Sequence, residues 1–100
     1  MGIMSRRKGA RIELDVLHEL QDAGIMCEKL SYAYRKTHDI RVVLFDKHLK
    51  MEVKCRAKGF ATIYNWLKPV DLLVLRRDRS EALVVMPIST LVELTKGKRE

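Results

Sequence analysis

The segment from His48 to Cys55 constrains the fold more than any other, because apolar and polar residues alternate there without a break. Such alternation is typical of a strand that packs one face on a core, since successive side chains of a strand point to opposite faces. The predicted core face carries Leu49, Met51, Val53 and Cys55, and the other face carries His48, Lys50, Glu52 and Lys54.

Two further strands are expected before this one. Short runs with β-branched residues at 25–33 and 39–45 predict them, and Asp46 with Lys47 forms the expected hairpin turn of a three-stranded meander. Upstream, apolar residues at helical spacing predict an amphipathic helix over residues 9–23, which Gly24 ends.

The second half of the chain predicts a helix, two strands and a closing helix. Residues 60–68 carry an apolar stripe expected in the core, and Pro69 ends that helix. Nearly continuous apolar runs at 70–75 and 82–86 are typical of strands in a covered sheet, and 88–96 predicts a helix. We therefore expect an α/β fold with a central mixed sheet of about five strands flanked by helices. Its 100 residues form one domain, with a basic arm at 1–8 and a basic tail at 97–100.

Charge favours a polyanionic partner. The chain has 20 Lys and Arg against 13 Asp and Glu, a formal net charge of +7, which points to nucleic acid. Cys27 and Cys55 have no disulfide or zinc spacing, and no apolar run reaches the length of a membrane span. We expect a cytoplasmic protein with no membrane partner and no small-molecule cofactor.

Three carboxylates and a lysine form the candidate chemical site. Glu13 falls near the middle of the apolar arc of the first helix, where a carboxylate needs a cation, a hydrogen-bond network or a wet cleft. Glu52 and Lys54 share one strand face, and Asp39 opens the neighbouring strand, so Asp39 and Glu52 can meet. Two carboxylates suit Mg²⁺, and a lysine beside them suits hydrolysis of a phosphodiester. A plain salt bridge for Glu13 and a solvated surface for Glu52 and Lys54 are the alternatives.

The order Glu13, Asp39, Glu52-Val53-Lys54 resembles the core of the PD-(D/E)XK nuclease superfamily. The residues 7–10 before Glu13 most resemble archaeal-type Holliday junction resolvases, including their viral and phage relatives. The resemblance covers residues 6–56 and implies a restriction-endonuclease-like core. His38 stands where that motif has proline, and residues 32–37 lack the family's Gly/Ser-rich character.

The resemblance implies a role for each matched residue. Asp39, Glu52 and the backbone carbonyl of Val53 match the metal ligands, and Lys54 matches the catalytic lysine. Glu13 matches the helix carboxylate that completes the site, where it can hold the metal through water, and Ser31 matches a serine of the segment before the aspartate. The implied metal is Mg²⁺, with Mn²⁺ able to substitute for it.

Basic residues around the acids are the expected DNA contacts, with a solvated basic surface as the alternative. They are Arg6, Arg7, Lys8, Arg11, Arg35, Lys36, Arg41, Arg56 and Lys58. His18, His38 and His48 have no ligand spacing and are not expected to bind metal. Trp66 lies off the apolar stripe of its helix, so with Phe60 and Tyr64 it is the expected interface of a homodimer.

The candidate site together with the resemblance predicts a Mg²⁺-dependent endodeoxyribonuclease that makes paired symmetric nicks in four-way junctions. Another nuclease of the same superfamily, acting on flaps, on duplex DNA or in recombination, is the first alternative, because a fold does not fix a substrate. A basic DNA-binding module without catalysis, in which the acids balance neighbouring lysines, is the second.

Overall fold

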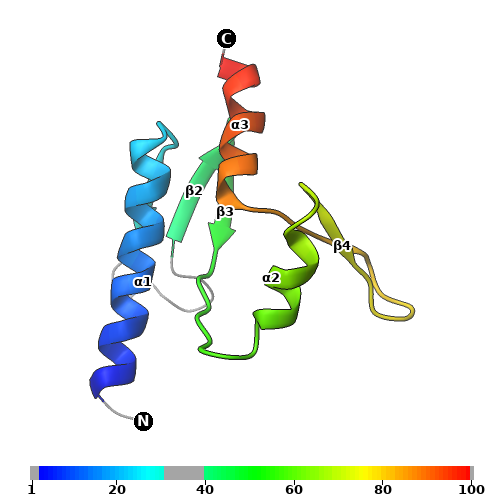
Figure 1. Cartoon of the computed structure of the whole chain (residues 1–100). Coiled ribbons are helices and arrows are strands. Elements are labelled where there is room, and N and C mark those ends of the chain that lie inside the picture. Colours follow the sequence, from blue (N-terminus) through cyan, green and yellow to red (C-terminus); the bar gives the residue numbers. More distant parts are fainter. Residues whose placement is uncertain (1–2, 31–39, 100) are drawn as a thin grey trace. The chain divides into compact units, whose positions relative to one another are not determined.

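The computed structural model describes residues 3–30 and 40–99, with side chains within 9–30 and 40–96 (Figure 1). The chain divides into two compact units, Met1–Cys55 and Arg56–Glu100. Helices and small antiparallel sheets make it a mixed α/β protein. The expectation of one mixed sheet of about five strands is wrong for the described residues. All the described pairings are antiparallel and join strands close in sequence, so a three-stranded and a two-stranded sheet form.

The first helix, α1, spans Ile3–Asp22 and begins six residues before the expected start at Gly9. Residues 3–8 contain no proline, and arginine and lysine are good helix formers. Residues 3–8 of the predicted basic arm are therefore helical and continue into α1.

The end of α1 is fixed by its glycine. Gly24 has a φ of 85°, its N–H donates to the Gln21 carbonyl at 2.9 Å, and the Ile25 N–H donates to the Leu20 carbonyl at 3.0 Å. These two bonds and the left-handed glycine form a Schellman motif. Leu20 and Ile25 are both buried, which supplies the apolar contact that accompanies the motif.

The three-stranded sheet has the order β1-β2-β3. Its strands are β1 (Cys27–Lys29), β2 (Ile40–Leu44) and β3 (Lys47–Met51), all shorter than predicted. Phe45 and Asp46 both have positive φ, at 52° and 67°, as a tight type I′ hairpin turn requires. The turn therefore lies one residue earlier than expected, because Phe45 takes the left-handed conformation and Lys47 already pairs with Leu44.

The buried apolar side chains of the first unit come from α1, the chain after it and β2. They are Leu17, Leu20, Ile25, Ile40 and Val42. The α1 helix packs on β1, and the Cys27 thiol donates to the Leu17 carbonyl at 3.7 Å. Leu49, predicted in the core, is 41% exposed. Leu49 lies on β3, at the sheet edge opposite β1. The predicted alternation along the strand is right, but at this edge the described residues leave the Leu49 side chain partly exposed.

The second unit holds α2 (Ala61–Leu67), β4 (Leu73–Leu75), β5 (Leu83–Val85) and α3 (Ile88–Arg99). Its α2 helix has no buried residue, and Tyr64 is 70% exposed, so the expected core stripe is wrong at Tyr64. The predicted basic tail at 97–100 is helical through Arg99.

Candidate functional site

One end of the three-stranded sheet organises the candidate site. The last paired row there is Lys29, Ile40 and Met51, one residue from each strand. Glu52 follows Met51 directly, and Asp39 is the residue covalently joined to Ile40. Asp39 itself lies outside the described residues.

Glu13 reaches the same row from α1. Its Oε2 lies 3.7 Å from the Lys29 Nζ, and its side chain is only 14% exposed. The helical wheel correctly placed this carboxylate toward the interior. The salt-bridge reading is confirmed, but Lys29 was missed as its partner. The signal was present, since Ile25, Cys27 and Lys29 alternate onto the face that meets α1.

Glu52 and Lys54 lie side by side just beyond β3. The Lys54 Nζ is 3.3 Å from the Glu52 Oε1, and both side chains are about half exposed. The half-buried residues Met51, Val53 and Cys55 alternate with these two, so the period of two continues past the last paired residue. The predicted juxtaposition of Glu52 and Lys54 is confirmed, although β3 ends at Met51 rather than at Cys55.

The remaining predicted site residues fall outside the described part of the chain. They are Ser31, Arg35, Lys36 and Asp39. Within residues 3–30 and 40–99, no group of three or more His, Cys, Asp or Glu side chains is placed to hold a metal ion. The candidate ligands Asp39, Glu52, Glu13 and the Val53 carbonyl are all oxygen donors, which is the donor set that a hard cation such as Mg²⁺ takes.

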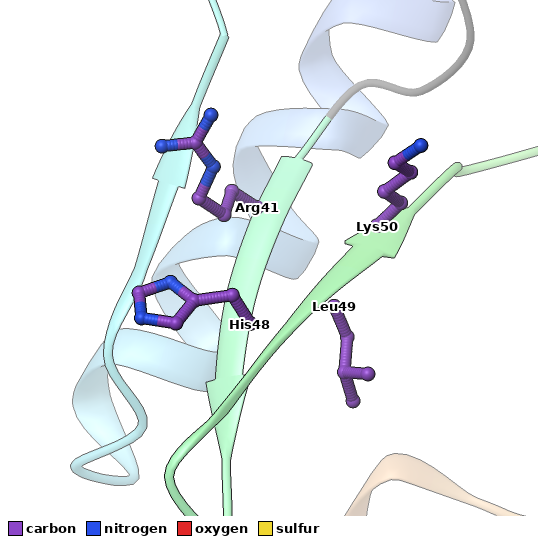
Figure 2. Close-up of a pocket in the computed structure, with 4 residues that line it drawn as sticks. All are labelled: Arg41, His48, Leu49 and Lys50. Atoms are coloured by element: carbon purple, nitrogen blue, oxygen red, sulfur yellow. The ribbon is translucent and has the colours of Figure 1, made fainter.

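A basic face runs along the sheet toward Glu52. Arg41 of β2 and Lys50 of β3 are directly opposite each other, and His48 follows on the same face (Figure 2). With Leu49 they line an open hollow of about 450 Å³. Like charges opposite each other repel, and Glu28 offsets only Arg41, at 3.4 Å. An anion between the two cations would relieve that repulsion.

This basic face was only partly foreseen. Arg41 was an expected DNA contact, whereas Lys50 and His48 were not. Their signal was the same alternation that revealed Glu52 and Lys54, because positions 48, 50, 52 and 54 share a face.

The other predicted DNA contacts are spread over both units. Arg6, Arg7 and Lys8 lie on the first turns of α1, and Arg11 is exposed one turn later. Arg56 and Lys58 are exposed at the start of the second unit.

Both cysteines carry free thiols. Burial raises the pKa of the Cys27 thiol above its ordinary value of 9.0, which disfavours the reactive thiolate.

The predicted interface residues are exposed in part. Trp66 is 55% and Tyr64 is 70% exposed, whereas Phe60 is half-buried just before α2. A homodimer stays a prediction.

Among the described helices, none combines the length and the apolar character that crossing a membrane would need. Comparison of the chain with models of protein families, with characterised proteins and with solved structures found no significant match.

Proposed function

We propose that this chain is a metal-dependent endodeoxyribonuclease of the PD-(D/E)XK type that cleaves four-way DNA junctions as a homodimer. One observation carries the proposal: Glu52 and Lys54 lie side by side directly after Met51, in the row of the sheet where Lys29 pairs with Glu13.

In the proposed site, Asp39, Glu52 and the Val53 carbonyl would hold a metal ion, and Glu13 would hold a water molecule beside it. Mg²⁺ bound there would polarise the phosphodiester and lower the pKa of a water molecule. Lys54 orients the attacking water and stabilises the negative charge that grows on the phosphorus centre.

In this scheme Glu52 would leave the Lys54 ammonium group and bind the metal ion instead. Its contact with Lys54 joins two half-exposed side chains, and such pairs stabilise a protein by at most about 1 kcal/mol. Glu52 would therefore give up its contact with the Lys54 ammonium group at little cost in order to hold a divalent cation. Lys54 then stays within reach of the scissile phosphate, because it is two residues along the same face.

DNA approaches over the basic face of the sheet. Lys50 is two residues from Glu52 and His48 is four, which is about 7 Å and 13 Å along an extended strand. Phosphates on one DNA strand rise 3.4 Å each, so these two side chains reach phosphates a few nucleotides from the cleaved bond.

A non-catalytic DNA-binding module is the second candidate, and a specific observation favours it. Glu13 and Glu52, the two candidate acids in the described residues, each lie within 4 Å of a lysine. Those carboxylates would then serve only to balance Lys29 and Lys54.

Glu52→Gln separates the two functions, with Glu28→Gln as the matched control because Glu28 is also an exposed, ion-paired carboxylate of this unit. Cleavage and binding of a labelled four-way junction are measured with Mg²⁺ and with EDTA. Nuclease function predicts that Glu52→Gln lowers the cleavage rate by at least about 100-fold and keeps binding, while Glu28→Gln cleaves normally. Equal cleavage by the two variants, or binding without cleavage by the wild type, would overturn the proposal.

The homodimer has its own test. Light scattering at micromolar concentration should give twice the monomer mass of 11.6 kDa, and Trp66→Ala should shift the mass toward the monomer. A monomeric wild type removes the dimer and leaves the chemical site untouched.

A further inference from the structure

The turn that joins β4 to β5 concentrates positive charge. Residues 76–79 read Arg-Arg-Asp-Arg, and Ser80 closes the turn by donating its N–H to the Arg77 carbonyl at 3.0 Å. Arg79 has a φ of 60° at this tip. The whole hairpin belongs to the second unit and lies apart in sequence from the candidate nuclease residues.

Ser80 holds two of these guanidinium groups. The Arg76 Nε donates to the Ser80 carbonyl at 3.1 Å, and the Arg77 Nε donates to the Ser80 Oγ at 3.2 Å. Each guanidinium has five N–H donors in a rigid plane, so the four on its two terminal nitrogens remain for another acceptor. Among the described residues, both arginines are thus held through Nε, and their terminal N–H groups are available.

Neither arginine is neutralised by its neighbours. Within the described residues Arg76 and Arg77 form no ion pair, although Asp78 and Glu81 are close in sequence. Their oxygen partners on Ser80 carry no net charge. An open hollow of about 630 Å³ adjoins them, lined by Leu75, Arg76, Arg77, Ser80, Glu81 and Leu83.

We propose that this hairpin tip binds the phosphate groups of a DNA backbone, with Arg76 and Arg77 as the contacts and Ser80 as the positioning residue. A phosphodiester offers two free oxygens that match the paired N–H groups of a guanidinium. An arginine already held through Nε loses less side-chain entropy on binding than a free one. The choice of DNA among polyanions rests on the proposed function, and the formal net charge of +7 agrees with it.

The first test measures the binding of a labelled four-way junction in EDTA over a series of salt concentrations. The double variant Arg76→Gln, Arg77→Gln should weaken binding about tenfold. The plot of log affinity against log salt should become less steep by about 1.8, because two phosphate contacts are lost. Lys68→Gln with Lys96→Gln removes the same charge from exposed positions of the same unit and is the matched control. It should leave the slope within about 0.5 of the wild type.

The second test holds the charge constant. Arg77→Lys and Ser80→Ala should each weaken binding about threefold. Arg77→Lys replaces the planar guanidinium group, and Ser80→Ala removes the hydroxyl that accepts from the Arg77 Nε. Arg79→Lys should bind like the wild type, since the structure gives Arg79 no bond to Ser80.

The proposal is overturned if the double glutamine variant keeps the affinity and salt slope of the lysine control. It is also overturned if Arg77→Lys and Ser80→Ala both bind like the wild type. These outcomes are distinct from a failure of the proposed function, because EDTA removes turnover. A wild type that binds the junction and never cleaves it would overturn only the nuclease.

Discussion

The two sheets of this chain differ in what covers them. The three-stranded sheet has a 20-residue helix packed on β1, and five apolar side chains of its unit are buried. In the second unit, Thr95 is the one buried side chain among those described, and Val74, Leu83 and Val84 on the two strands are each more than half exposed. The first unit therefore has its own apolar core, whereas the described strands of the second unit present exposed apolar side chains.

The largest expected effect contrasts one leucine from each unit. Leu20→Ala should lower the free energy of unfolding by about 2–5 kcal/mol, because Leu20 is completely buried. Leu83→Ala should lower it by less than about 1 kcal/mol, because its side chain is 60% exposed. Chemical denaturation measures both. A cost above 2 kcal/mol for Leu83→Ala would contradict the exposed ribbon and indicate that this surface is covered in solution.

Two glycines of the first unit sharpen the account of α1. Gly24→Ala should destabilise the protein by about 1–2 kcal/mol, because alanine is strained at a φ of 85°. Gly9→Ala should stabilise it by about 0.5–1 kcal/mol, because Gly9 is inside the helix with open space around its missing Cβ. Thermal unfolding compares them, and a Gly9→Ala variant that loses stability would contradict the early start of α1.

Two ion pairs extend the comparison to polar contacts. Double-mutant cycles with Glu13→Gln and Lys29→Met should give a coupling of about 0.5–1 kcal/mol, because Glu13 is mostly shielded from water. The exposed pair of Glu93 and Lys96 on α3 should give about 0.3 kcal/mol and lose it in high salt. Equal coupling energies for the two pairs would mean that the Glu13 side chain is as exposed to solvent as a surface residue.

The smallest expected effect concerns Cys27. Burial raises the pKa of the Cys27 thiol in the folded state, so the stability that this shift contributes is fully present below the unfolded pKa and is lost as pH rises through the folded pKa. Cys27→Ala should therefore lessen the loss of stability between pH 8 and pH 10. A thiol reagent should modify Cys27 more slowly in the native chain than in the denatured chain. Equal rates would contradict its burial.

Alternation and helical spacing predicted much of the first unit. The apolar arc placed Leu17 and Leu20 in the core, and the period of two placed Glu52 beside Lys54. These patterns work because they depend only on local backbone geometry.

What was missed depends on contacts that no local pattern contains. The left-handed conformation of Phe45 moved the hairpin turn by one residue, and the edge position of β3 left Leu49 exposed. In the candidate site, alternation put Lys29 on the face that meets α1, but its pairing with Glu13 depends on how α1 packs against β1.

The most direct test of the central claim is cleavage by the wild type of four-way junction, flap and linear duplex DNA of matched sequence, each with Mg²⁺ or EDTA, beside Lys54→Ala. We predict paired nicks in the junction alone, lost in EDTA and reduced at least about 100-fold by Lys54→Ala. Cleavage of flap or duplex DNA would keep the site and change its substrate. Tight binding without metal-dependent cleavage of any of the three substrates would contradict the account.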